Sequence, residues 1–180
     1  MAPDGGFSIQ DTQLIAETPF LRLEEVDLLT PDGTIGKRTV IRIGGAVSVV
    51  AVDNDHVILI RQYRTPVDRA LLELPAGKLD VVGEDPLEAA KRELEEEVGY
   101  VADHYEVLAN FRTSPGFSDE EMTIYLATKL TATEATPIGP EEIAAEIVRV
   151  PVDAIPGLLP EIDDAKTVIG LMAFLLRQVG

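Results

Sequence analysis

The chain has 180 residues, the usual length of one domain or of one domain with a small appendage, and its 46% hydrophobic and 26% charged residues are typical of a globular protein with a buried core. Its formal net charge of -17 argues against polynucleotide binding, because nucleic-acid phosphates are also negative; an anionic small substrate would need placed Arg or Lys residues or divalent cations. The absence of cysteine excludes disulfides, thiolate catalysis and cysteine-based metal sites.

Residues 1–42 are predicted to form a small antiparallel β unit that begins with a loose tail. A sheet of this size is too small to fold alone. The domain that follows is predicted to span residues 43–180. The alternating segments of the first unit are 13–18, 20–30 and 37–43, and the turn residues PDGT occupy 31–34.

The rest of the chain alternates between strands and helices, which predicts an α+β fold, an α/β/α sandwich around a mixed sheet. The apolar run AVSVVAV at 46–52 indicates a strand buried on both faces, which pairs through the turn DNDH with VILIRQYR. Asp85 and Pro86 predict the cap and first turn of a helix that ends at Gly99. A further strand is expected within 70–77, ended by Pro75 and Gly77. Others are expected at 105–112, 122–130 and 146–151, with a short helical piece near 152–159 and a final helix over about 163–178.

Neither end of the chain predicts a targeting or membrane segment. The first ten residues, MAPDGGFSIQ, lack the basic and apolar regions of a signal peptide. The longest apolar run, VIGLMAFLL at 168–176, is far shorter than the roughly 20 residues of a bilayer span, so a buried helix is expected. The expected location is the cytoplasm, without membrane partners.

Four carboxylates crowd the end of the predicted helix over 86–98. Glu93 and Glu97 lie one turn apart, where like charges repel by a few tenths of a kcal/mol, and acids at this end also oppose the helix dipole. One interpretation is a solvated acidic face. The other is a site for Mg²⁺, with Mn²⁺ as a possible substitute, since hard cations bind one or two carboxylates together with phosphate.

The segment from Gly77 to Tyr100, GKLDVVGEDPLEAAKRELEEEVGY, resembles the Nudix box. One departure exists, because six residues rather than five separate Gly77 from Glu84; we interpret it as an insertion in the loop, where length changes are tolerated. The positions that match are Glu84, Arg92, Glu93, Leu94, Glu96, Glu97, Gly99 and Tyr100.

The resemblance implies a role for each matching residue. Glu93 and Glu97 would be the principal metal ligands, with Glu96 and the carbonyl of Ala76 completing the set. Arg92 would orient an acid without touching the metal, and Glu84 would stabilise the loop through Arg92. The alternatives are a surface ion pair for Arg92 and a simple helix-N-terminal charge for Glu84.

Segments outside the box narrow the resemblance to the branch of ADP-ribose pyrophosphatases. They are RQYR at 61–64, ELPAGK at 73–78 and TSPGFSDE at 113–120, with Pro115 fifteen residues after the box. Arg61 or Arg64 could offer a planar guanidinium to a diphosphate, or either could form a structural ion pair. Further substrate contacts are assigned to Glu73, Ser114, Gly116, Phe20 and Tyr63. The two aromatics would stack on a base, although an aromatic residue in a strand is more often part of the core.

The implied reaction is metal-assisted attack of water on ADP-ribose, which gives AMP and ribose 5-phosphate. A carboxylate must take a proton from that water. In this branch it comes from a loop before the last main strand, where Glu142 is the first candidate and Glu141 the second; either could instead be a solvated loop acid.

In relatives the N-terminal unit packs across a homodimer and contacts substrate, so a homodimer is expected here. One alternative function is hydrolysis of another nucleoside diphosphate sugar or of a modified nucleotide. A second, from a different class, is a nucleotide-sensing module that keeps the fold without cleaving its ligand; intact Glu93, Glu96 and Glu97 argue against it.

Overall fold

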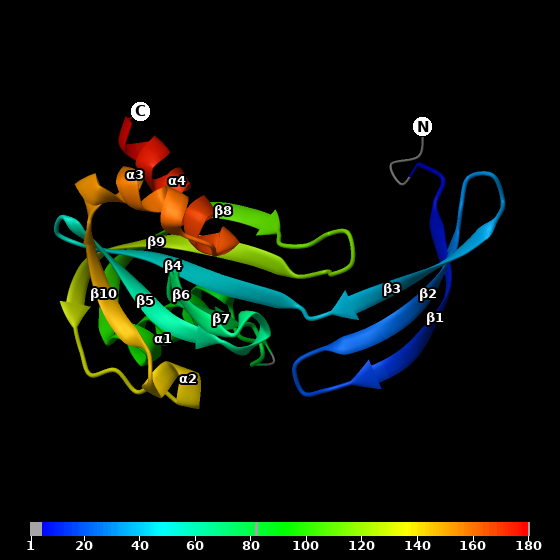
Figure 1. Cartoon of the computed structure of the whole chain (residues 1–180), viewed down its shortest axis with the longest axis horizontal. Coiled ribbons are helices and arrows are strands. Elements are labelled where there is room, and N and C mark those ends of the chain that lie inside the picture. The colour runs from blue at the N-terminus through cyan, green and yellow to red at the C-terminus, as the bar shows by residue number, and fades with distance from the viewer. Residues whose placement is uncertain (1–4, 82, 180) are drawn as a thin grey trace. The chain divides into compact units, whose positions relative to one another are not determined.

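The computed structural model describes residues 5–81 and 83–179, and these form two compact units (Figure 1). The first unit contains the chain up to Gly44 together with Arg112–Glu121, and the second contains Gly45–Phe111 and the chain from Met122 onward. Each unit is described separately below. Residue 82, which lies in the loop of the proposed insertion, and most of the predicted N-terminal tail fall outside the described residues.

The first unit is an antiparallel sheet in the order β1-β2-β3 (Figure 1). The predicted turn joins β2 and β3, with Gly33 at φ 84°, a left-handed conformation that glycine adopts without strain. All residues of β1 are exposed, whereas Glu24 on β2 is buried and accepts a hydrogen bond from Arg42. The three predicted strands are therefore present, as β1 (Ser8–Glu17), β2 (Arg22–Leu29) and β3 (Ile35–Arg42).

The second unit is built on a sheet in the order β10-β5-β4-β9-β8. The predicted hairpin is confirmed, because Asp53 on β4 pairs with His56 on β5 in an antiparallel register. The run 46–51 on β4 is buried throughout, as predicted for a strand covered on both faces. The strands are β4 (Gly45–Asp53), β5 (His56–Arg64), β8 (Tyr100–Arg112), β9 (Glu121–Ala132) and β10 (Glu146–Pro151).

The predicted end of a strand near Pro75 is confirmed, but the prediction of a single strand that also ends at Gly77 was wrong. The segment forms two strands, β6 (Arg69–Glu73) paired with β5 and β7 (Ala76–Lys78) paired with β4. Pro75 lies at the break, and its carbonyl accepts hydrogen bonds from the Val49 amide and the Ser48 hydroxyl. Proline cannot donate to a ladder, so the chain changes its partner strand there, and Gly77 lies inside β7.

Helices cover both faces of this sheet, as Figure 1 shows for the second unit. One core cluster contains Ala90 and Leu94 of α1, and the other contains Leu171 and Phe174 of α4. The final helix is thus part of the core, as predicted. The helices are α1 (Pro86–Val98), α2 (Pro140–Ile143), α3 (Ile155–Leu158) and α4 (Ala165–Val179), with 3-10 turns at Thr65–Val67, Val152–Ala154 and Leu159–Glu161.

Among the described residues, none of the helices has both the length and the apolar character needed to cross a bilayer.

Candidate active site

The acidic end of α1 lies against β7. Asp85 caps the helix by accepting a hydrogen bond from the Leu87 amide, and Gly99 at φ 67° ends it, as the sequence predicts. The Ala76 amide then donates to Glu97 Oε2 at 2.9 Å. This hydrogen bond joins the helix to the strand at the carboxylate that the sequence singles out.

Gly77 allows Glu93 to lie against the backbone of β7. A Cβ atom at position 77 would lie 2.0 Å from both Cδ and Oε1 of Glu93, far inside van der Waals contact. Any side chain at position 77 would therefore displace the Glu93 carboxylate. The glycine that opens the Nudix-like segment has a steric function at this strand.

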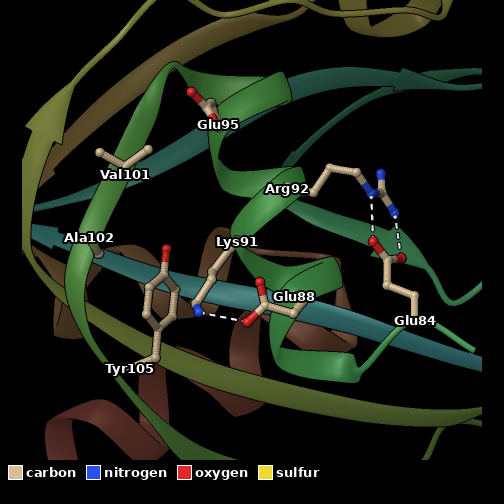
Figure 2. A pocket seen from close by; sticks show the side chains of 8 residues that line it. All are labelled: Glu84, Glu88, Lys91, Arg92, Glu95, Val101, Ala102 and Tyr105. Carbon is tan, nitrogen blue, oxygen red and sulfur yellow. Dashed lines mark hydrogen bonds and ion pairs between the residues drawn. The ribbon is translucent and has the colours of Figure 1, made fainter.

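Arg92 is surrounded by three carboxylates. Its Nε and a terminal nitrogen donate to the two oxygens of Glu84 at 3.1 and 3.2 Å, an arrangement visible in Figure 2. Its other terminal nitrogen donates to Glu93 Oε1 at 2.7 Å and to Glu96 Oε2 at 3.1 Å. These hydrogen bonds raise the pKa of Arg92, so the guanidinium stays charged and holds the acids in place.

The ionised forms of Glu97 and Glu93 are disfavoured in the folded protein. Burial raises the pKa of Glu97 to about 8, with further contributions from the charges of Glu93 and Glu142, against the Ala76 amide and Arg64, which lower it. Burial also raises the pKa of Glu93, although Arg92 opposes the shift. A cation bound beside these groups would relieve both effects.

The donor set fits a hard divalent cation that keeps open positions for water and substrate. Within residues 5–81 and 83–179, no group of three or more His, Cys, Asp or Glu side chains is placed so that it could hold a metal ion. Mg²⁺ does not require one, because it is commonly held by one or two carboxylates and substrate phosphates. The hydrogen bonds between β7 and β4 on either side of Ala76 join Val49 to Pro75 and Leu79 to Gly45. In an antiparallel ladder the residue between such pairs directs both its amide and its carbonyl away from the partner strand. The Ala76 carbonyl therefore points to the same side as its amide, which binds Glu97.

Glu142 and Glu97 line one recess together with Ile60, Gln62 and Ala145. Glu142 Oε2 accepts hydrogen bonds from the Ile138 and Gly139 amides at 2.9 and 3.2 Å, which fix this carboxylate at the start of α2. Glu141 is exposed and does not line the recess. The geometry therefore favours Glu142 over Glu141 as the group that faces Glu97.

Arg64 forms a two-point ion pair with Glu73, with both N–O distances at 2.7 Å. Glu73 is only 1% exposed, and Lys166 of α4 binds its second oxygen. The structural ion pair that was the alternative role for Arg64 is thus present, with Glu73 as its partner. Arg61 lies on the opposite, exposed face of β5, 3.5 Å from Glu146, and the exposed Tyr63 donates to Asp68.

Three of the candidate substrate contacts belong to the first unit. Phe20 is 60% exposed. The Ser114 carbonyl accepts hydrogen bonds from the Phe117 and Ser118 amides, so Ser114 and Gly116 lie in a tight turn. Their roles remain predictions.

The sequence analysis did not single out Lys166 and Gln62. No local pattern marks Lys166, whose partner Glu73 is 93 positions away. The sequence did contain a reason to single out Gln62. Alternate residues of a strand share one face, so Gln62 lies on the same face of β5 as Ile60 and Arg64. A polar residue at such a position is expected to have a buried partner or a functional reason.

A mixed sheet between helices, with paired carboxylates at the end of α1 and Glu142 in one recess with Glu97, defines the class of metal-assisted Nudix-type hydrolases. The model of the NUDIX domain family matches residues 42–169, and the chain belongs to this family. The α+β prediction of a Nudix-type sandwich with a separate small antiparallel sheet is confirmed. Nudix hydrolases generally depend on divalent metals, and this chain is expected to be an enzyme of that kind.

Two relatives and one solved structure are similar over most of the chain. The methanol dehydrogenase activator of Bacillus methanolicus is 36% identical over 170 residues, 93% of this chain and 91% of the relative. The ADP-ribose pyrophosphatase of Bacillus subtilis (strain 168) is 38% identical over 161 residues, 88% of this chain and 85% of the relative. A crystal structure of an ADP compounds hydrolase superposes with a TM-score of 0.86 at 29% identity, covering 97% of this chain and 96% of that one.

Proposed function

We propose that this protein hydrolyses the pyrophosphate bond of ADP-ribose, giving AMP and ribose 5-phosphate, with Mg²⁺ or Mn²⁺ as cofactor. The observation that carries the proposal is the convergence of Glu93 and Glu97 of α1 on β7, with Glu142 in the same recess as Glu97. The ADP-ribose pyrophosphatase of Bacillus subtilis and the ADP compounds hydrolase support this choice of substrate. The proposed location is the cytoplasm.

Each residue has a chemical task in this proposal. Glu93, Glu97 and the Ala76 carbonyl hold the metal, with Glu96 beside them, and Arg92 orients the acids through its bonds to Glu93 and Glu96. A divalent cation bound there supplies charge neutralisation and lowers the pKa of water.

The base is assigned to Glu142. The amides of Ile138 and Gly139 bind one of its oxygens, and the other oxygen is the proposed acceptor of a proton from the attacking water. Arg64, held by Glu73, is the proposed diphosphate contact, because a guanidinium retains donors beyond the two that this ion pair uses. We propose five further substrate contacts, at Arg61, Tyr63, Phe20, Ser114 and Gly116.

Product analysis after incubation with ADP-ribose and Mg²⁺ tests the proposal. We expect equimolar AMP and ribose 5-phosphate, abolished by EDTA. Glu97→Gln should lose metal-dependent turnover, whereas Glu95→Gln, an exposed acid on the same helix, should retain it. Wild-type activity in the Glu97 variant would refute the metal role.

The alternative substrates are separated by a panel of nucleoside diphosphate sugars and modified nucleotides. A preference for one of them by more than about tenfold in kcat/KM, roughly 1.4 kcal/mol, would replace ADP-ribose as the substrate. Binding of ADP-ribose without turnover at any metal concentration would instead indicate a sensing module.

We also propose that residues 1–42 form a dimerisation and substrate-contact unit and that residues 43–180 form the catalytic domain. Every residue of β1 is exposed, and Ile9 and Ile15 are 58% and 54% exposed, an unusual apolar surface for a free sheet edge. We propose that a second copy of the chain packs against this apolar surface of β1. Sedimentation should give a dimer for the wild type and a monomer for Ile9→Lys combined with Ile15→Lys; a wild-type monomer at micromolar concentration would contradict the proposal.

A further inference from the structure

A buried carboxylate, Glu73, lies between two cations in the second unit. It is at the end of β6, is 1% exposed, and accepts hydrogen bonds from Nε and Nη2 of Arg64, both at 2.7 Å. Lys166 donates from the first turn of α4 to the same Glu73 oxygen that Nη2 of Arg64 contacts. One buried negative charge is thus shared by two positive ones.

Lys166 is not placed favourably for the stability of its own helix. A cation in the first turn opposes the helix dipole, and the Lys166 side chain is only 12% exposed, so it has also lost most of its hydration. Asp164 compensates in part, because its Oδ1 accepts from Lys166 at 3.0 Å. Since apolar groups of similar size often replace buried ion pairs without loss of stability, stability alone is a weak explanation for this lysine.

Arg64 is the member of this cluster that reaches solvent. Its side chain is 39% exposed, and among the described residues its third nitrogen, Nη1, has no hydrogen-bond partner. The charge of Arg64 also lowers the pKa of Glu97, so the guanidinium lies within electrostatic reach of the proposed metal carboxylate. Arg64 is therefore placed to attract an anion that binds beside Glu97.

The charge balance of the cluster decides how strongly Arg64 attracts such an anion. A guanidinium paired with one carboxylate forms a neutral pair, whose attraction for a third group is weak. Lys166 adds a second positive charge at Glu73 and so offsets the carboxylate. Asp164 adds a negative charge, but its Oδ2 accepts from the Thr167 amide at 2.9 Å, where the positive end of the α4 dipole offsets part of it.

We infer that Lys166 is a positioning residue for the diphosphate of the substrate: it holds Glu73 and offsets its charge, so that Arg64 stays fixed and attractive to an anion. This inference rests on the proposed function, because it takes Arg64 as the diphosphate contact. Lys166 donates to Glu73 and Asp164, so it acts through Arg64 and not by touching the substrate. Its effect is therefore expected in substrate binding.

Lys166→Gln tests the inference, because glutamine keeps a donor for Glu73 but has no charge. We expect KM for ADP-ribose to rise about 5- to 10-fold with kcat changed less than about twofold, as when an interaction present in both ground and transition states is lost. ADP affinity, measured by calorimetric titration with Mg²⁺ present, should fall by the same factor. A folded Lys166→Gln variant with wild-type KM and ADP affinity would overturn the inference.

Lys166→Arg is the second variant, because it keeps the positive charge. Its KM and ADP affinity should stay within about twofold of the wild-type values, so the proposal stays testable if Lys166→Gln does not fold. A loss of ADP affinity of about 5- to 10-fold in folded Lys166→Arg would show that the charge is not what matters at this position.

A double-mutant cycle with Arg64→Ala tests whether Lys166 acts through Arg64. Once the guanidinium is absent, Lys166→Gln should cause no further loss of kcat/KM or of ADP affinity. An equal loss in both backgrounds would mean that Lys166 affects the substrate without Arg64, and the inference would be wrong.

Thr167→Val is the matched control for stability. Thr167 is fully buried beside Lys166, and its hydroxyl accepts a hydrogen bond from the Leu74 amide at 2.8 Å and donates to Asp164 at 2.5 Å. Its loss leaves a buried amide unpaired, so the thermal midpoint should fall while KM and ADP affinity stay at wild-type values. If Thr167→Val raises KM as much as Lys166→Gln does, a general loosening of the start of α4 explains both effects, and the inference is wrong.

The two hypotheses fail differently. If the wild type releases no product from ADP-ribose, the proposed function fails, and the ADP titrations still compare the variants. If the wild type is active and Lys166→Gln matches it in KM and ADP affinity, only the role of Lys166 is lost.

Discussion

The backbone amide of Ala76 donates to Glu97 Oε2 at 2.9 Å, across 21 positions of sequence and from a strand to a helix. This donor favours the ionised carboxylate, yet burial outweighs it and raises the pKa of Glu97 to about 8. The protein thus keeps an acid oriented by its backbone in a place where the negative charge is unfavourable. A cation bound beside Glu97 would stabilise the ionised carboxylate, which burial destabilises in the metal-free protein.

The first prediction concerns pH and the metal-free protein. Because the pKa of Glu97 is about 8 in the folded chain and near 4.5 when unfolded, the folded state binds more protons between these values. Glu97 therefore lowers stability as pH rises through this window, by a few kcal/mol at most. Glu93 and Glu142 face Glu97 and act in the same direction, whereas Arg64 opposes them.

Thermal unfolding in EDTA at pH 6 and at pH 8.5 measures this effect. The wild type should lose stability at the higher pH, and Glu97→Gln should lose less, because glutamine does not ionise. Added Mg²⁺ should stabilise the wild type more at pH 8.5 than at pH 6, since the metal competes with the proton. Equal pH dependence in wild type and variant would contradict the environment described for Glu97.

The second prediction concerns Gly77. Gly77→Ala places a methyl group where Glu93 now lies, 2.0 Å from its Cδ, so the carboxylate must move. We expect a stability loss of about 1–3 kcal/mol and the loss of most metal-dependent activity. Gly157→Ala is the control, because no atom lies within 4 Å of the added Cβ there. Unfolding curves and kcat should separate the two; normal activity in Gly77→Ala would show that the Glu93 position is not required.

The third prediction concerns Arg92. Arg92→Lys keeps the charge but cannot bind both oxygens of Glu84 while reaching Glu93 and Glu96. We expect metal affinity to fall by about 10- to 100-fold, as for other groups that orient ligands.

Lys91→Ala is the matched control for Arg92. The Lys91 side chain is 43% exposed, pairs with Glu88 one turn earlier, and lies over the ring of Tyr105 (Figure 2). Its loss should change stability by less than about 1 kcal/mol and leave Mn²⁺ affinity intact. Similar affinities in the two variants would show that Arg92 is only another surface charge.

Local patterns predicted the parts of the fold that depend on nearby residues. A continuous apolar run identified β4, and the turn after it identified the hairpin with β5. Asp85, Pro86 and Gly99 identified both ends of α1, because caps act within a few residues. Helical spacing also placed Glu93 and Glu97 one turn apart.

Sequence reasoning failed where distant partners decide the structure. Pro75 marks the end of a strand locally, but the second strand that follows it depends on pairing with β4, whereas the residues before Pro75 pair with β5. The environment of Gln62 likewise depends on Glu142, which arrives from a loop 80 positions later. The partners in the Glu73–Lys166 pair are 93 positions apart, so the pair has no local sequence pattern.

The fourth prediction concerns that pair. Burial alone would raise the pKa of Glu73, but Arg64 and Lys166 bring it below its ordinary value. Lys166→Met removes one of these cations and also the partner of Asp164, at 3.0 Å. We expect a loss of about 1–3 kcal/mol in the free energy of unfolding, because a buried carboxylate keeps only one partner.

Arg69→Met is the control for Lys166→Met, since Arg69 and Asp163 form an ion pair whose side chains are 57% and 61% exposed. An exposed pair contributes at most about 1 kcal/mol, so this variant should unfold near the wild-type midpoint. Lys166→Met should unfold about 2–4 °C lower for each kcal/mol lost, and the difference should narrow as pH falls and Glu73 is protonated in both proteins. If the two variants have the same thermal midpoint at pH 7, the buried Glu73–Lys166 pair contributes no more stability than the exposed Arg69–Asp163 pair. Lys166 would then not anchor α4 to the end of β6.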